Sequence, residues 1–308
     1  MTRLNVVAPR QGVDLRAGGG TAFGSFGELL QGVLPDDDVD FLVTFPIDRG
    51  SRVRFRLDPG GELRVFPSHK WKARTLARML MDASGWDGGG TLILDSELPV
   101  GKGLASSSAD LVATARALGA VLGLDTSPTA IEDWLRQIEP TDGVMYPGVV
   151  AFEHRRVRLR SFLGPLPPVT VVAIDEGGQV DTVAFNARRK PFAESGKHEY
   201  ADLLGRLAAA VPAADLAVVG KVATRSTMLN QALLPKRHLA ALLSICEEKD
   251  ALGVVCAHSG TVIGVMLADD QPGHDTRLAE VRSACAHLSS SRLEFHSLAF
   301  DLESRYAL

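Results

Sequence analysis

The sequence predicts an α+β fold in which helices and paired strands mix without a regular β–α–β alternation. Segments 72–85 and 107–122 place apolar residues at helical spacing. Segments 40–47 and 51–58 alternate or run apolar in the manner of strands. The 308 residues, 45% hydrophobic and 23% charged, have an ordinary globular balance and suffice for one large domain or two smaller ones.

The first part of the chain is expected to be mainly strands. Residues 1–18 are expected to be a loose tail, and 21–32 to begin as a strand that meets a turn of small residues. Segments 40–47 and 51–58 are expected to form a hairpin around the intervening Asp-Arg-Gly. A helix over 72–85 ending at glycine, and a strand over 90–98, follow.

Two helices come next. Ser107 and Asp110 fit the S-x-x-D form of a capping box, which predicts a helix that begins at Ser107 and ends near residue 122. The following helix is bounded by Ser127, a residue suited to a helix N-cap, and by Pro140, which cannot continue a helix.

The proline-rich segment 164–168 predicts a boundary between two domains, 19–165 and 166–308. The expected elements of the second domain are helices at 198–211, 214–231, 236–249 and 274–288, strand-like residues 252–267 and an edge strand at 292–300.

Charge and composition exclude several classes of function. A net charge of -4 gives no global attraction to nucleic acid or to anionic membranes. No apolar run approaches the length of a spanning helix, and the N-terminus lacks the apolar core of a secretory signal. Cys246, Cys256 and Cys285 form no CxxC pair and read as buried small side chains in a reducing compartment. We therefore expect a cytoplasmic protein without a nucleic-acid or membrane partner; a homodimer is a possible assembly.

The stretch SELPVGKGLASSSAD, residues 96–110, has the composition of a phosphate-binding loop. Gly101 and Gly103 allow a ligand to approach the backbone closely, and the helix that follows presents unpaired N–H groups at its positive end. The hydroxyls of Ser106, Ser107 and Ser108 suit phosphate or Mg²⁺. Lys102 adds a positive charge. Taken alone, the segment fits a glycine- and serine-rich turn before a capped helix equally well. The Walker pattern G-x-x-x-x-G-K-[ST] is absent.

The words LPVGKGLASSSAD resemble the second signature of the GHMP kinases, named for galactokinase, homoserine, mevalonate and phosphomevalonate kinases. Its form P-x-x-x-G-L-x-S-S-x-A is matched by Pro99, Gly103, Leu104, Ser106, Ser107 and Ala109. Ala105 departs from the glycine of many members. GTAFGSFGELLQG resembles the first signature and VVCAHSGTVIGVML the third, in the same order along the chain.

GSFGELLQG, EPTDGV and AHSG are most similar to one branch, the L-threonine kinases of cobalamin side-chain synthesis. The resemblance implies an S5-like N-terminal domain, a ferredoxin-like C-terminal domain, and ATP with Mg²⁺ as cofactors. It implies an ATP-dependent kinase for the side-chain hydroxyl of a hydroxy amino acid, with L-threonine favoured. Serine, homoserine or a specialised β-hydroxy amino acid, and a GHMP-fold protein that binds a metabolite without catalysis, remain open.

The resemblance also implies roles for single residues. Asp142 resembles a catalytic base, and Ser107 with a helix glutamate resembles a pair of Mg²⁺ ligands. Glu132 and Glu139 share one helical face, and Glu132 is the preferred candidate of the two. Ser25 and Glu28, beside the acceptor, and Asp48, at the expected hairpin end, are the substrate candidates. The residues expected at the nucleotide are Pro99, Gly101, Lys102, Gly103, Leu104, Ser106, Ser107, Ser108, Trp71, Ser259 and Gly260.

For several of these residues a structural role is an alternative. Asp142 could cap a turn, Ser107 could be a simple N-cap, and Glu132 could lie on a solvated Glu–Arg–Glu helix face. Trp71, proposed to border the adenine, could belong to a basic surface loop.

Overall fold

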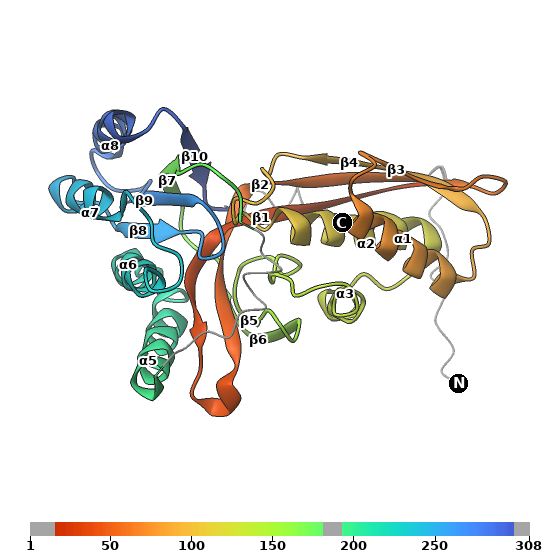
Figure 1. Cartoon of the computed structure of the whole chain (residues 1–308), viewed down its shortest axis with the longest axis horizontal. Coiled ribbons are helices and arrows are strands. Elements are labelled where there is room, and N and C mark those ends of the chain that lie inside the picture. The colour runs from red at the N-terminus through yellow and green to blue at the C-terminus, as the bar shows by residue number, and fades with distance from the viewer. Residues whose placement is uncertain (1–15, 181–192, 299–308) are drawn as a thin grey trace.

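The computed structural model describes residues 16–180 and 193–298. Its α+β architecture is built on one large sheet with the strand order β10-β7-β9-β8-β1-β2-β4-β3. Figure 1 shows the long strands β1 and β2 running through the molecule, with α1 and α2 beneath β4 and β3 and the later helices at the other end. The domain boundary expected after residue 165 falls between β6 and β7. The division into two domains stays a prediction.

The elements of the first half are mostly strands. They are β1 (Ala17–Val33), η1 (Asp36–Asp38), β2 (Asp40–Asp58), β3 (Leu63–Phe66), α1 (Trp71–Ser84), β4 (Gly89–Ser96), α2 (Ser106–Leu122), α3 (Pro128–Leu135), β5 (Val149–Glu153) and β6 (Arg158–Gly164). The ends predicted for α1 and α2 are confirmed, because Gly85 and Gly123 each take the left-handed conformation that closes a helix.

The second half packs helices against four strands. It contains β7 (Val169–Asp175), α5 (Glu194–Ala210), α6 (Leu216–Asn230), α7 (Leu239–Glu248), β8 (Gly253–Cys256), β9 (Val262–Ala268), α8 (His274–Leu288) and β10 (Arg292–His296). Side chains of β7, β8, β9, α7 and α8 form a core cluster of their own, separate from the larger cluster that spans the rest of the molecule. The predicted helix 274–288 is confirmed to the residue.

The predicted hairpin of 40–47 and 51–58 is wrong, because these residues form the single strand β2. Both parts pair with β1, from Asp40 opposite Val33 to Arg56 opposite Ala17, so the partner strand holds β2 extended. The register shifts near Phe23 and Gly24, where the pairing jumps from Gly50 to Ile47. The Asp-Arg-Gly sequence therefore occupies a bulge in the sheet instead of a turn.

The expected loose tail also ends earlier than predicted, since β1 begins at Ala17; residues 1–15 lie outside the described part of the chain. The glycines at the start of β1 allow α2 to lie directly on the strand. A Cβ at Gly20 would be 2.2 Å from the carbonyl oxygen of Ala113, whereas a Cβ at Gly19, on the other face, would meet only one atom, at 3.9 Å. These glycines serve close packing of a helix on a strand.

We predict that Gly20→Ala destabilises the protein, because α2 must move away from β1 to admit the methyl group. An overpacked core position costs about 1–3 kcal/mol, and the melting temperature should fall by several degrees. Gly19→Ala is the matched control and should leave the melting temperature nearly unchanged. Thermal unfolding measured by circular dichroism checks both, and equal effects of the two substitutions would contradict this packing.

Candidate active site

The loop between β4 and α2 uses its backbone carbonyls to hold itself against the rest of the molecule. The carbonyl of Gly103 accepts from Gly27 N–H (3.0 Å) and that of Leu104 from Ser25 N–H (3.3 Å), both in β1. The carbonyl of Lys102 accepts from Thr261 N–H (3.2 Å). These bonds tie the loop to the first strand and to the turn between β8 and β9.

The N–H groups of the same loop have no such partners. From Lys102 to Ser108, none of the backbone N–H groups donates to any group in the described ranges. Those of Ser106 to Ser108 belong to the first turn of α2, where the helix dipole adds a partial positive charge. A run of unpaired N–H groups at a helix N-terminus is a binding site for an anion such as phosphate.

The capping box predicted for this helix is wrong. The helix begins at Ser106, and its N-cap is Ala105, which adopts the left-handed conformation (φ 59°) and makes no side-chain cap. The Asp110 carboxylate instead accepts hydrogen bonds from Lys70 Nζ (2.5 Å) and Ser51 Oγ (2.6 Å). The first turn of α2 therefore stays open to a ligand.

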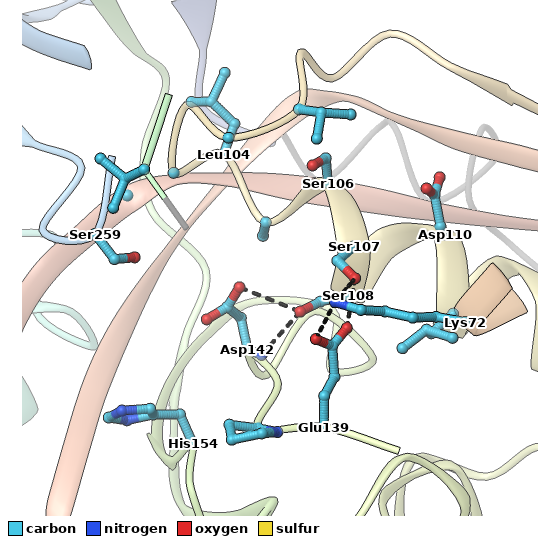
Figure 2. A pocket seen from close by; sticks show the side chains of 18 of the residues that line it. Lys72, Leu104, Ser106, Ser107, Ser108, Asp110, Glu139, Asp142, His154 and Ser259 are labelled. Atoms are coloured by element: carbon cyan, nitrogen blue, oxygen red, sulfur yellow. Dashed lines mark hydrogen bonds and ion pairs between the residues drawn. The ribbon is translucent and has the colours of Figure 1, made fainter. Parts of the chain in front are cut away.

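A cavity of about 580 Å³ lies against this loop. It is lined by the helix start and by residues from β1, α1, the segment before β5 and the third-signature turn (Figure 2). The polar side chains around it are Glu28, Gln31, His69, Lys70, Lys72, Ser106, Ser107, Ser108, Asp110, Glu139, Asp142, His154, Gln179 and Ser259.

Ser107, Glu139 and Lys72 form one polar cluster at the cavity wall. Ser107 Oγ donates to Glu139 Oε1, and Lys72 Nζ lies 2.5 Å from Glu139 Oε2 and 3.4 Å from Ser107 Oγ. Figure 2 shows the three side chains converging below the start of α2. A hydroxyl and a carboxylate side by side supply the oxygen ligands that Mg²⁺ prefers. No cluster of three or more His, Cys, Asp or Glu suited to a metal occurs among the described residues.

Glu132, expected as the second metal ligand, is not in the cavity. Its carboxylate is buried, and its Oε1 accepts hydrogen bonds from Tyr146 Oη (2.9 Å) and Leu159 N–H (2.8 Å). The solvated alternative for Glu132 is wrong as well, because only 5% of the residue is exposed. The carboxylate beside Ser107 is that of Glu139, which follows the end of α3 in the EPTDGV segment.

Asp142 lies beside the first turn of α2. Its Oδ2 accepts a hydrogen bond from the Ser108 hydroxyl (3.2 Å). The backbone N–H of Asp142 donates in turn to Ser108 Oγ (3.1 Å). Burial, with the negative charges of Glu28 and Glu139, raises the pKa of Asp142 to about 7 against the opposing effect of the Ser108 hydrogen bond. A carboxyl group with a pKa near neutrality suits proton transfer in a cavity.

Glu28 enters the cavity from β1 near a bulge at Gly27, which has a positive φ of 49°. Its Oε2 accepts from both the backbone N–H and Nδ1 of His258, each at 3.0 Å. Trp71 also lines the cavity, with 61% of its surface exposed, and Lys72 Nζ lies 5.7 Å from its ring centre.

Several predicted site residues lie outside the cavity lining. Ser25 Oγ donates to the carbonyl of Gly27 (2.7 Å) and accepts from Phe45 N–H (2.8 Å), which fixes a bulge in the sheet. Asp48 lies within β2, at a bulge and not at a hairpin end, and its carboxylate is 3.4 Å from His296 N. Pro99 precedes the lining residue Val100.

Lys102 and Gly260 have structural contacts instead of cavity-facing ones. The ammonium of Lys102 pairs with Asp175 (2.6 Å) and donates to the carbonyl of Gly178 (2.7 Å), so it points away from the free N–H groups. A Cβ at Gly260 would be 2.0 Å from the carbonyl oxygen of Lys102. This glycine therefore lets the third-signature turn touch the loop, and Ser259 beside it reaches the cavity.

Sequence reasoning preferred Glu132 to Glu139 as the second metal ligand. It missed Lys72 as a partner of Ser107, and Gln31 and His154 as lining residues. Glu139 had a local signal, because it directly precedes Pro140 in the segment that supplies Asp142. Lys72 had no local signal as a partner of Ser107, because only the packing of α1 beside α2 brings the two residues together.

The chain is similar to known proteins in sequence and in fold. Residues 72–149 match the family model of the GHMP kinase N-terminal domain. The L-threonine kinase of Salmonella typhimurium is 32% identical over 82% of each chain, and that of Citrobacter freundii is 30% identical over 82% of this chain and 86% of its own. The homoserine kinase structure from Cytophaga hutchinsonii has a TM-score of 0.72 at 16% identity, over 96% of this chain and 98% of its own.

Within the described residues no helix is long and apolar enough to span a bilayer. The family model and the two curated relatives identify the same family, and the solved structures share its fold. The chain belongs to the GHMP kinase superfamily and is an ATP-dependent phosphotransferase with an alcohol acceptor.

Proposed function

We propose that the protein is an L-threonine kinase that transfers the γ-phosphoryl group of Mg·ATP to the threonine side-chain hydroxyl. The observation that carries the proposal is the joining, in one cavity, of the unpaired N–H run of Gly103 to Ser108 with the Asp142 carboxyl. The names of the two curated relatives favour L-threonine over other hydroxy amino acids.

The N–H groups at the start of α2 would bind the phosphates, and Ser107 and Glu139 would hold the metal ion. Bound ATP would supply the phosphoryl group, and its Mg²⁺ ion would neutralise much of the negative charge on the phosphates. Lys72, which contacts both proposed ligands, adds a positive charge beside them. Phosphoryl transfer depends mainly on alignment and charge stabilisation, and these residues provide both.

Asp142 would orient the acceptor hydroxyl and take its proton. The carboxylate form is needed for this role, and a pKa of about 7 leaves a large fraction of it ionised at neutral pH. Ser108 holds the side chain in place through its hydroxyl, which both donates to Asp142 and accepts from its backbone.

A coupled ADP-release assay over a panel of hydroxy amino acids and small alcohols tests the function, with each product identified by mass. We expect L-threonine to give the highest kcat/KM and O-phosphothreonine as product. A preference for serine or homoserine would keep the protein a kinase but change its proposed acceptor. ATP binding without turnover of any acceptor would instead favour a metabolite-binding protein.

We predict that Ser107→Ala and Glu139→Gln each lower kcat by at least about tenfold and raise the Mg²⁺ concentration needed for half-maximal rate. Each substitution removes one oxygen ligand from the proposed metal site. Glu132→Gln is the matched control, because its carboxylate lies outside the cavity; it should lower thermal stability and leave the Mg²⁺ dependence unchanged. A Mg²⁺ titration at saturating ATP distinguishes these outcomes. If Glu139→Gln needed no more Mg²⁺ for half-maximal rate than the wild type, Glu139 would not be a metal ligand.

We predict that kcat/KM for the acceptor rises as pH increases through about 7, because Asp142 must lose its proton to act as a base. Glu28 and Glu139 contribute to the elevated pKa, and Ser108 opposes it. Asp142→Asn should lower kcat by at least about a hundredfold and abolish this rise. Initial rates between pH 5.5 and 9 check the profile; an unchanged kcat in the variant would refute the role of base.

A further inference from the structure

Glu28 is a buried carboxylate that uses only one of its two oxygens. The residue is 5% exposed and lines the cavity. Both of its hydrogen bonds, from His258 N–H and His258 Nδ1, go to Oε2. Oε1 has no hydrogen bond to any group in the described ranges, and it is not sealed from the cavity. Oε1 is therefore the acceptor that Glu28 offers to a ligand in the cavity.

A chain of hydrogen bonds fixes the orientation of this carboxylate. His258 is 1% exposed, and its Nε2 lies 2.7 Å from Ser226 Oγ in α6. Ser226 Oγ accepts from the backbone N–H of Gln31 at 3.3 Å, so its own proton is free to go to Nε2. This arrangement leaves the His258 proton on Nδ1, facing Glu28. The Glu28 side chain is thereby held with Oε2 toward His258.

The charge near Glu28 is not balanced by the cations of the cavity. Lys70 and Lys72 line the cavity, but they pair with Asp110 and Glu139, respectively. Lys236 interacts electrostatically with Glu28, but its ammonium donates to the carbonyl of Gly260 and does not line the cavity. Asp142 faces the same space and feels the negative charge of Glu28. A cation bound between the two carboxylates would relieve their repulsion.

We propose that Oε1 of Glu28 binds the primary ammonium group of the acceptor, with His258 as the residue that positions Glu28. The inference rests on the proposed function, because it requires an acceptor that carries an amino group close to its hydroxyl. With the ammonium on Glu28, the neighbouring hydroxyl lies toward Asp142. Glu28 thus selects hydroxy amino acids against alcohols that lack the amino group.

The ammonium also changes the state of Asp142. Part of the upward pKa shift of Asp142 comes from the negative charge of Glu28. A positive group between the two carboxylates offsets that effect, so the acceptor itself favours the ionised base. An acceptor without the amino group leaves Glu28 unpaired, and sites built to bind a polar group reject such analogues strongly.

The test compares L-threonine with (R)-3-hydroxybutyrate, which has the same hydroxyl and carboxylate but no amino group. ADP release and product mass give kcat/KM for each. We expect the wild-type enzyme to prefer L-threonine by at least about a hundredfold. In Glu28→Gln the preference should fall by at least about tenfold, through loss of activity on L-threonine, while the rate with (R)-3-hydroxybutyrate stays the same or rises. Glu62→Gln, an exposed carboxylate outside the cavity, is the matched control and should keep the wild-type preference.

Two variants of His258 test its positioning role. His258→Ala removes the side-chain donor to Glu28 and should lower the preference for L-threonine, whereas His258→Asn, whose amide can donate from near the Nδ1 position, should restore much of it. A purely structural role would lower kcat/KM for both acceptors together and leave their ratio unchanged. Equal preference in His258→Ala and the wild type would overturn the positioning role.

The outcomes separate this proposal from the proposed function. Similar kcat/KM values for L-threonine and (R)-3-hydroxybutyrate in the wild type would overturn the ammonium site and leave the kinase assignment intact. Absence of activity with every hydroxy amino acid would overturn both. If Glu28→Gln does not fold, N-acetyl-L-threonine, which retains the hydroxyl and carboxylate but has no ammonium, replaces the variant. Its phosphorylation by the wild type at the rate of L-threonine would equally overturn the proposal.

Discussion

The backbone carbonyls from Gly101 to Ala105 are all used as acceptors, and this constraint determines what the loop can do. Val180, Thr261 and two residues of β1 supply N–H donors, and the helix itself supplies the last one. Since the carbonyls are turned toward the protein, the N–H groups that alternate with them along the same chain are left for the cavity. The anion site is therefore a consequence of how the loop is anchored, and its side chains contribute less than its backbone.

The charged groups of the cavity divide into two kinds. Lys70 with Asp110, and Lys72 with Glu139, are pairs that hold α1 against the start of α2 and the segment after α3. Glu28 and Asp142 have no lysine partner in the cavity lining, and their mutual repulsion is sustained because β1, the β8–β9 turn and α2 hold each side chain rigidly. Such an arrangement disfavours the empty site and favours a cationic ligand.

Local sequence predicted those features that depend on neighbours in the chain. Gly85 and Gly123 end their helices, and residues 51–58, whose pattern is typical of a strand, lie in β2. Features that depend on distant contacts were missed. The sequence alone does not distinguish Glu132 from Glu139. In the fold, Tyr146 and Leu159 donate hydrogen bonds to Glu132, whereas Glu139 lies beside Ser107. The continuity of β2 likewise comes from its partner β1, which no local pattern records.

A crystal structure with Mg²⁺ and a non-hydrolysable ATP analogue tests the central claim most directly. The account predicts the β- and γ-phosphates within hydrogen-bond distance of the N–H groups between Lys102 and Ser108, with the metal ion on Ser107 and Glu139 and with Lys102 still paired to Asp175. Phosphates bound elsewhere, with these N–H groups satisfied by water or by their own chain, would contradict it.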